Sequence, residues 1–244
     1  MILVIFGSAS DKEIYNPIIQ SLKQKNLDFE FRICSAHRTP DMLAKILEKH
    51  YDLIIAGAGL AAHLPGVVAS HTTSPIIGVP CTGNFDGLDA FFSVVQMPGG
   101  MPVLAYGVNG NPVDTTFLFE KHEKVNIIGN KENKRVQKCI KLLEEFSIEY
   151  DFNNDEGLKL NFYDLLTENP IQEAINVPLK DGSTIEDAHS FFAKSKNVFH
   201  VGLNRGDNAA LFATQLIKPE LIDGFREKAA KKVFEADEKE RIVK

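Results

Sequence analysis

Short apolar runs alternate with amphipathic segments through the first 110 residues of the chain. Apolar positions spaced three or four apart predict helices that begin near Ser10 and Pro40 and a third helix over 87–95. Strands that are apolar on both faces and alternate with helices are typical of a parallel sheet covered on both sides. We therefore predict an α/β fold, with strands at 2–6, 29–33, 52–56, 75–79 and 102–108.

Three loops that follow predicted strands carry small and polar residues. Gly7–Asp11 follows the first strand, Ser35–Pro40 the second and Gly57–Gly66 the third. In a parallel sheet such loops meet at one edge and form the ligand crevice. Ser10 and Glu13 predict a capping box that leaves the helix N-terminus facing the first loop, where it favours an anion. The small residues of the third loop predict close approach of the backbone to a ligand.

The second half resembles a faded copy of the first. Val125–Gly129 lines up with Leu3–Gly7 at a spacing of 122. Val177-Pro178 lines up with Val79-Pro80 at a spacing of 98, and 198–204 lines up with 103–109 at a spacing of 95. The drop from 122 to 98 removes 24 residues (122 minus 98) from the segment where two of the loops would lie. We predict a tandem duplication with a reduced second copy.

This repeat divides the chain into a catalytic domain (1–122), a degenerate domain (123–218) and a terminal amphipathic helix (219–244). The alternative is one domain with a long insertion, roughly 110–200, before a final helix at 208–211. The second copy has no counterpart of the Ser35–Pro40 loop. We therefore expect it to be non-catalytic and to supply oligomer contacts.

Composition and charge narrow the class of function. A net charge of -6 argues against nucleic acid and acidic membranes as partners. The three cysteines are widely spaced and read as reduced thiols. The N-terminal run is shorter than a signal peptide core, and no run approaches the roughly 20 residues of a membrane span. We expect a cytoplasmic protein that binds a small molecule.

The residues of the three loops carry acid–base and phosphate-binding chemistry. His37 exchanges a proton near neutral pH, and the adjacent Arg38 suits bidentate binding of a phosphate. The hydroxyls of Ser10 and Ser35 and the first helix N-terminus add phosphate donors, while the ionised Asp11 accepts from ribose hydroxyls. His63, in the third loop, is a candidate for orienting the substrate.

Six motifs in order resemble the class I N5-carboxyaminoimidazole ribonucleotide mutases of purine biosynthesis, also called the PurE family, over about residues 1–110. They are Gly7–Asp11, Ser35–Pro40, Ala56–Gly66, Gly78–Pro80, Gly87–Asp89 and Gln96–Gly100. The resemblance implies a flavodoxin-like three-layer fold, a nucleotide substrate, no metal and no organic cofactor. It also implies moving a carboxylate from the exocyclic nitrogen to carbon 4 of an aminoimidazole ribonucleotide, with release and recapture of CO2 in a closed site.

Carried over to this chain, the resemblance places His37 on the family's catalytic histidine and Ser8, Asp11 and Arg38 on its substrate-binding positions. Adding His63 from the third loop, we expect His37 and His63 to be the catalytic residues. The expected substrate-binding residues are Ser8, Ser10, Asp11, Ser35, Arg38, Gly59, Ala61 and Leu64. The family forms octamers of single domains. A duplicated chain therefore predicts a homo-oligomer, with a tetramer of two-copy chains as the equivalent ring.

Two departures from the family pattern bear on function. Leu60 stands where the family has a small residue, and Asn111–Phe119 stands where the family has a late Asn-Ala-Ala-Leu-Leu-Ala helix. Asn208–Ala213 resembles that helix, at the end of the second half. Direct carboxylation of aminoimidazole ribonucleotide by CO2 and non-catalytic nucleotide binding stay open as alternatives.

Overall fold

The computed structural model describes residues 1–110 and 115–242. The first part of the chain forms β1 (Ile2–Phe6), η1 (Ala9–Asp11), α1 (Lys12–Gln24), β2 (Phe29–Ile33), α2 (Pro40–Leu47), β3 (Leu53–Ala58), α3 (His63–His71), β4 (Ile76–Pro80), α4 (Leu88–Val95), β5 (Leu104–Tyr106) and α5 (Thr116–Phe119). The predicted strands are therefore confirmed to within two residues at each end. Residues 111–114, the start of the Asn111–Phe119 segment, lie outside the described residues.

The second part repeats the alternation of strands and helices, with fewer helices among its strands. It forms β6 (Lys124–Ile128), α6 (Lys134–Glu145), β7 (Glu149–Phe152), β8 (Leu158–Asp164), β9 (Ile175–Leu179), α7 (Ile185–Lys194), β10 (Phe199–His200), α8 (Gly206–Ile217), η2 (Pro219–Leu221) and α9 (Ile222–Glu240).

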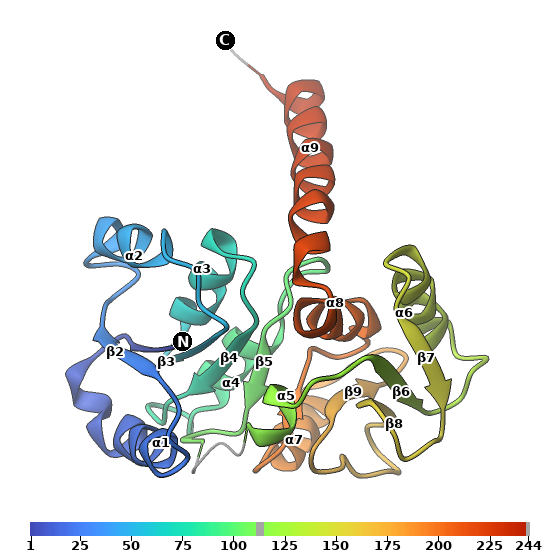
Figure 1. Cartoon of the computed structure of the whole chain (residues 1–244), viewed down its shortest axis with the longest axis horizontal. Coiled ribbons are helices and arrows are strands. Elements are labelled where there is room, and N and C mark those ends of the chain that lie inside the picture. Colours follow the sequence, from blue (N-terminus) through green and yellow to red (C-terminus); the bar gives the residue numbers. More distant parts are fainter. Residues whose placement is uncertain (111–114, 243–244) are drawn as a thin grey trace.

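Within the described residues, ten strands form one sheet in the order β2-β1-β3-β4-β5-β10-β9-β8-β6-β7. Neighbouring strands pair in parallel except at the centre, where β10 pairs antiparallel with β5. The two halves therefore share a sheet rather than forming two, as Figure 1 shows. The strand order 2-1-3-4-5 of the first half returns as 7-6-8-9-10 in the second.

Helices cover both faces of the sheet and give the expected three layers. One face, here called the α1 face, has a core that includes Tyr15 of α1, Phe117 of α5, Val136 of α6 and the alanines of α8. The other, the α2 face, buries residues of α2, α3, α4 and α7. Corresponding helices of the two halves therefore cover the same face of the sheet. This is expected because β5 and β10 meet antiparallel, so the second half is turned within the plane of the sheet and keeps its faces.

Two of the three sequence alignments between the halves recur in local geometry. Asn109 and Asn204 both have left-handed backbones, with φ of 60° and 62°. The backbone N–H of each donates at 2.8 Å to the carbonyl of a proline at the end of a parallel strand or one residue before it, Pro80 in β4 or Pro178 in β9. Each asparagine side chain also accepts a backbone N–H two residues beyond that proline. The spacings of 95 and 98 therefore join residues in the same structural role.

The predicted alignment of Val125–Gly129 with Leu3–Gly7, at a spacing of 122, is wrong by an odd number of residues. Leu3 packs on the α2 face, whereas Val125, its partner in that alignment, packs on the α1 face. Successive side chains of a strand point to opposite faces, so equivalent positions must differ by one residue from this alignment. The turn that follows each first helix fits a spacing of 121, because Asn26 and Ser147 both have φ of 52°.

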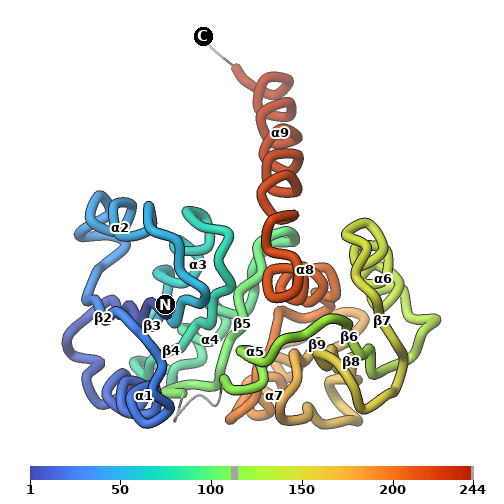
Figure 2. The backbone as a smooth tube through the Cα atoms, viewed as in Figure 1, coloured from blue at the N-terminus to red at the C-terminus, as the bar shows by residue number. Residues whose placement is uncertain are grey.

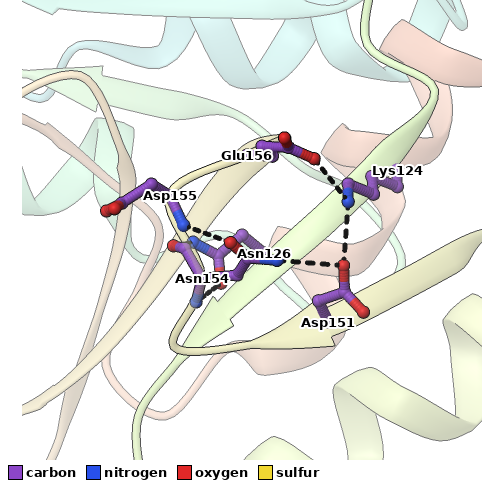
Figure 3. Close-up of polar contacts among 6 residues, drawn as sticks. All are labelled: Lys124, Asn126, Asp151, Asn154, Asp155 and Glu156. Carbon is purple, nitrogen blue, oxygen red and sulfur yellow. Dashed lines mark hydrogen bonds and ion pairs between the residues drawn. The ribbon is translucent and has the colours of Figure 1, made fainter.

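The connection from β7 to β8 is the part of the second half that differs most from the first. Residues 153–157 carry the chain past β6 without a helix, where the first half has the Ser35–Pro40 loop and α2. The buried Asn126 side chain exchanges hydrogen bonds with the N–H and carbonyl of Asn154. Lys124 binds Asp151 at 2.9 Å and Glu156 at 3.0 Å (Figure 3). Asn126 thus satisfies backbone groups of this very short crossover, and Lys124 ties the side chains at its two ends together.

Helix α8 joins the halves. It packs closely against α6, and ten consecutive residues, 206–215, are buried. Asn208 accepts from Gly100 N–H at 2.9 Å and donates to the carbonyl of Pro98 at 3.0 Å. Gln215 donates to the carbonyl of Thr73 at 2.8 Å. The segment that resembles the family's late helix is therefore held by the first half as well as by the second.

Helix α9 projects away from the rest of the molecule, with the C-terminus at its far end (Figures 1 and 2). Its first turn is attached to the body by the buried Ile222 and by Arg226, whose guanidinium donates to the carbonyls of Ala69 and Thr72 at the end of α3. Among the described residues, no helix combines the length and apolar character needed to cross a membrane.

Candidate functional site

The loops that follow β1, β2, β3 and β4 surround a cavity of about 550 Å³ at the carboxyl edge of the first half-sheet. Every residue predicted for the site lines this cavity: Ser8, Ser10, Asp11, Ser35, His37, Arg38, Gly59, Ala61, His63 and Leu64. The convergence of the three loops is therefore confirmed. Further residues line the same cavity, namely Gly7, Ala36, Ala58, Leu60, Thr82 and Gly83.

The first loop forms a single 3-10 turn before α1. Ser8 caps that turn, since its hydroxyl accepts the backbone N–H of Ser10 at 3.1 Å. The hydroxyls of Ser8 and Ser10 lie 2.7 Å apart, and Ser10 also donates to the Asp11 carboxylate at 3.4 Å. The predicted capping box of Ser10 with Glu13 is wrong, because α1 begins only at Lys12 and the hydroxyl of Ser10 is turned toward the cavity-lining residues instead.

The Asp11 carboxyl lies partly buried at the floor of this loop. Burial raises its pKa above the ordinary value of 3.8, and the hydrogen bond from Ser10 acts in the opposite direction. A carboxylate that has already lost part of its hydration gains more from hydrogen-bond donors on a ligand than a fully solvated one does. Asp11 is therefore prepared to accept hydroxyl donors.

The second loop is held by bonds between its two ends. Thr39 N–H donates to the Ser35 carbonyl at 2.9 Å, and Ser35 N–H donates to the Thr39 hydroxyl at 3.0 Å. The guanidinium of Arg38 donates to the Gly7 carbonyl at 3.3 Å and to the Ser35 hydroxyl at 3.4 Å. Arg38 therefore bridges the first and second loops and places a fixed positive charge beside the Ser35 hydroxyl in the cavity.

His37 and His63 contact each other at the wall of the cavity. His37 Nε2 lies 3.0 Å from His63 Nδ1, and the two rings are perpendicular with centroids 5.0 Å apart. One of the two nitrogens must donate and the other accept, so the pair can hold a proton between them. Both side chains are exposed to the cavity and to solvent. This pair brings together the two residues predicted to be catalytic.

The small residues of the third loop are not all explained by close approach of the backbone to a ligand, as the sequence predicted. A Cβ at Gly57 would lie 2.1 Å from the ring of Phe6, so this glycine is required by packing within the sheet rather than by a ligand. Gly59 lines the cavity, and a Cβ there would make only ordinary contact with Cys81. Leu60 adopts φ of 55° with its side chain 59% exposed at the cavity rim. A leucine in this left-handed conformation carries strain that a glycine would not.

Thr82 and Gly83 are site residues that the sequence reading missed. They follow β4 directly, and Thr82 N–H donates to the Asn109 side chain at 2.7 Å. The signal that could have found them is their position after the fourth parallel strand, because that strand ends at the same edge as the first three.

The cysteines near the site are not placed as nucleophiles. Cys34 is buried beneath the second loop, 3.4 Å from the Thr39 hydroxyl. Cys81 is buried behind Gly59, and this burial raises its thiol pKa, which keeps it protonated. Among the described residues, no group of three or more His, Cys, Asp or Glu side chains is arranged to hold a metal ion.

The first half of the chain matches a known family of proteins. Residues 1–118 match the family described as AIR carboxylase. An N5-carboxyaminoimidazole ribonucleotide mutase from Methanocaldococcus jannaschii is 51% identical over 110 residues, which cover 45% of this chain and 70% of that protein. A phosphoribosylaminoimidazole carboxylase from Ogataea methanolica is 49% identical over 111 residues, covering 43% of this chain and 20% of that protein.

Among solved structures, the chain is similar to Treponema denticola PurE at 25% identity, with a TM-score of 0.44, over 49% of this chain and 81% of that one. The sequence matches are stronger and lie over the half of the chain that holds the cavity. Because half of the aligned residues are identical across most of the Methanocaldococcus protein, the chain belongs, through residues 1–118, to the AIR carboxylase family.

Proposed function

We propose that the chain converts N5-carboxyaminoimidazole ribonucleotide to 4-carboxy-5-aminoimidazole ribonucleotide in de novo purine biosynthesis. The observation that carries this proposal is the His37–His63 pair, 3.0 Å apart, beside Arg38 in a cavity of about 550 Å³. The reaction needs a proton moved between a nitrogen and a carbon of one bound substrate. A histidine pair at the cavity wall provides that group without a cofactor.

The polar residues around the cavity divide into two binding roles. The substrate phosphate is bound by Arg38 and by the hydroxyls of Ser8, Ser10 and Ser35. These groups supply hydrogen-bond donors together with a fixed positive charge. Asp11 accepts the ribose hydroxyls, which replace the water that burial has partly removed. Gly59, Ala61 and Leu64 lie along the third loop, where the aminoimidazole ring is held against small and apolar groups.

The proton steps follow from this placement. The bond from the exocyclic nitrogen to the carboxylate breaks and leaves its electron pair on nitrogen, which takes a proton from His37 as CO2 departs. Carbon 4 of the ring then attacks the same CO2, and His37 takes the proton that carbon 4 loses. His63 holds His37 in position and shares its proton through the 3.0 Å contact. No net proton enters or leaves.

Direct carboxylation of aminoimidazole ribonucleotide by CO2 is the second candidate, because it uses the same proton removal at carbon 4. The 49% identity to a phosphoribosylaminoimidazole carboxylase favours keeping it. Non-catalytic nucleotide binding is the third candidate, and the exposed Leu60 at the cavity rim is the feature that favours it.

One assay with two substrates separates these candidates. The purified chain is given the carbamate substrate, or aminoimidazole ribonucleotide with bicarbonate, and the carbon-carboxylated product is followed. Turnover of the carbamate alone supports the mutase, and faster turnover with bicarbonate supports the carboxylase. Binding without turnover in both arms would leave only the nucleotide-binding candidate. His37→Asn serves as the catalytically impaired control, because its exposed side chain contributes little to folding.

We infer that residues 123–218 are a second, degenerate copy of the 1–122 domain that has no catalytic role of its own. The repeated strand order and the matched hydrogen bonds of Asn109 and Asn204 support this. The 153–157 crossover, which replaces the loop that holds His37, supports the loss of chemistry. We further propose a homo-oligomer, with four two-copy chains as the equivalent of a ring of eight domains.

A further inference from the structure

Helix α9 carries an apolar stripe that continues beyond its attachment to the body. Ile222 is buried and Phe225 packs against Phe146, with ring centroids 5.9 Å apart. The stripe continues with Ala229, four residues after Phe225, then Val233, four residues further, and Ala236, three residues further. At these spacings the side chains lie on the same side of the helix. Val233 is 68% exposed. The stripe therefore leaves the body and runs into solvent along the projecting helix (Figure 1).

A groove of about 500 Å³ lies at the foot of α9, on the side of this stripe. Its apolar floor includes Leu142, Leu211 and Phe225. Four of its lining residues are cationic and two are acidic: Lys138, Lys141, Arg205 and Lys232 against Glu145 and Asp207. The groove is thus basic on a chain whose net charge is -6, and it suits an acidic, partly apolar segment.

Such a segment exists at the other end of the same helix. Residues 226–232 carry four basic side chains and one acidic one, whereas 233–240 carry four acidic side chains and one basic one. Two copies of α9 laid antiparallel place the acidic half of each against the basic half of the other. A two-fold pair of this kind is self-complementary, since each copy gives and receives the same contacts.

We propose that α9 pairs antiparallel with α9 of a second copy of this chain, and that the acidic tip of each helix enters the basic groove at the foot of the other. In the register that sets the small alanine side chains of the two helices against each other, Ala229 lies opposite Ala236 of the second copy. This register also brings the two Val233 side chains together. The same register puts Lys232 beside Glu235 of the second copy and the Glu240 turn beside the Phe225 groove. Alanines at the contact allow the helices to approach closely.

The first experiment measures the mass of the full chain by sedimentation velocity over a range of concentrations. Val233→Glu places two carboxylates together at the centre of the pair and is expected to weaken self-association about tenfold or more, halving the mass of the assembly. Lys231→Glu is the matched control: it reverses one charge of the basic half on the side of the helix away from the stripe, and is expected to weaken association much less than Val233→Glu does. Circular dichroism verifies that both variants keep their helix content.

A charge swap tests the register. Lys232→Glu is expected to weaken association, and the double variant Lys232→Glu/Glu235→Lys to restore it, since both charges of the pair are then reversed. Mild oxidation provides an independent test: Val233→Cys is expected to form a disulfide-linked dimer and Lys231→Cys is not, because only the first lies at the contact. A wild-type chain that is monomeric, or one whose mass is unchanged by Val233→Glu, would overturn the proposal.

Discussion

His200 offers a measurement of how firmly the two halves are joined. It lies on β10, opposite Ala105 of β5 in the antiparallel pair at the centre of the sheet, and it is fully buried. Its Nε2 lies 3.0 Å from the Tyr163 hydroxyl, while its Nδ1 has no hydrogen-bond partner among the described residues. This burial lowers the pKa of the imidazole from 6.5 to about 3.

The sign of the pH effect follows from that shift. In the folded chain His200 stays neutral down to about pH 3, whereas in the unfolded chain it binds a proton below about pH 6.5. Acid therefore favours the unfolded state, and stability falls as the pH drops through this window. For these two pKa values the loss is about 2 kcal/mol by pH 5 and about 4 kcal/mol at pH 3.

Urea unfolding at about pH 7.5 and about pH 5 measures this loss. His200→Gln lowers stability at both pH values, because the core loses its fitted ring, but the extra loss on acidification should shrink by about 2 kcal/mol relative to the wild type. His189→Asn removes an exposed imidazole and is the matched control. Equal acid losses in the wild type and His200→Gln would refute the reasoning.

Three further predictions concern the site. His37→Asn is expected to lower kcat by about 10²- to 10⁴-fold with an unchanged thermal unfolding temperature, in product-formation and melting assays. Leu60→Gly is expected to be more stable than Leu60→Ala by about 1 kcal/mol, measured by urea unfolding, because only glycine relieves the left-handed φ of 55°. Asp11→Asn is expected to raise stability near neutral pH while weakening substrate binding. Burial raises the folded pKa of Asp11, so the wild type should gain on this variant as the pH falls through that value.

The candidate site was largely predictable because each of its loops follows a strand that the sequence marks clearly. Buried runs such as 2–6 and 53–58 are apolar throughout, and the residues after them are small or polar. Parallel pairing then brings His37 and His63 together from positions 26 residues apart. The pair itself needed no long-range information beyond strand order.

The joining of the halves was not predictable in the same way. The strand that makes the junction, β10, has only two residues, and nothing in Phe199-His200 distinguishes pairing with β5 from pairing elsewhere. The alignment at 122 failed for a related reason. Apolar runs such as Leu3–Phe6 are buried on both faces, so the sequence pattern does not reveal which face each side chain takes.

The shared sheet gives the second half a structural role although it has no counterpart of the Ser35–Pro40 loop. Strand β5 has three buried residues, Leu104–Tyr106, and β4 pairs with one of its two edges. Unpaired, its other edge would expose backbone donors and acceptors beside apolar side chains, which is a template for aggregation. Pairing with β10 closes that edge, and α8 adds the bonds of Asn208 and Gln215 to the first half. These contacts do not depend on the Ser35–Pro40 loop. The second half therefore contributes to the sheet that carries the cavity without contributing residues to the cavity itself.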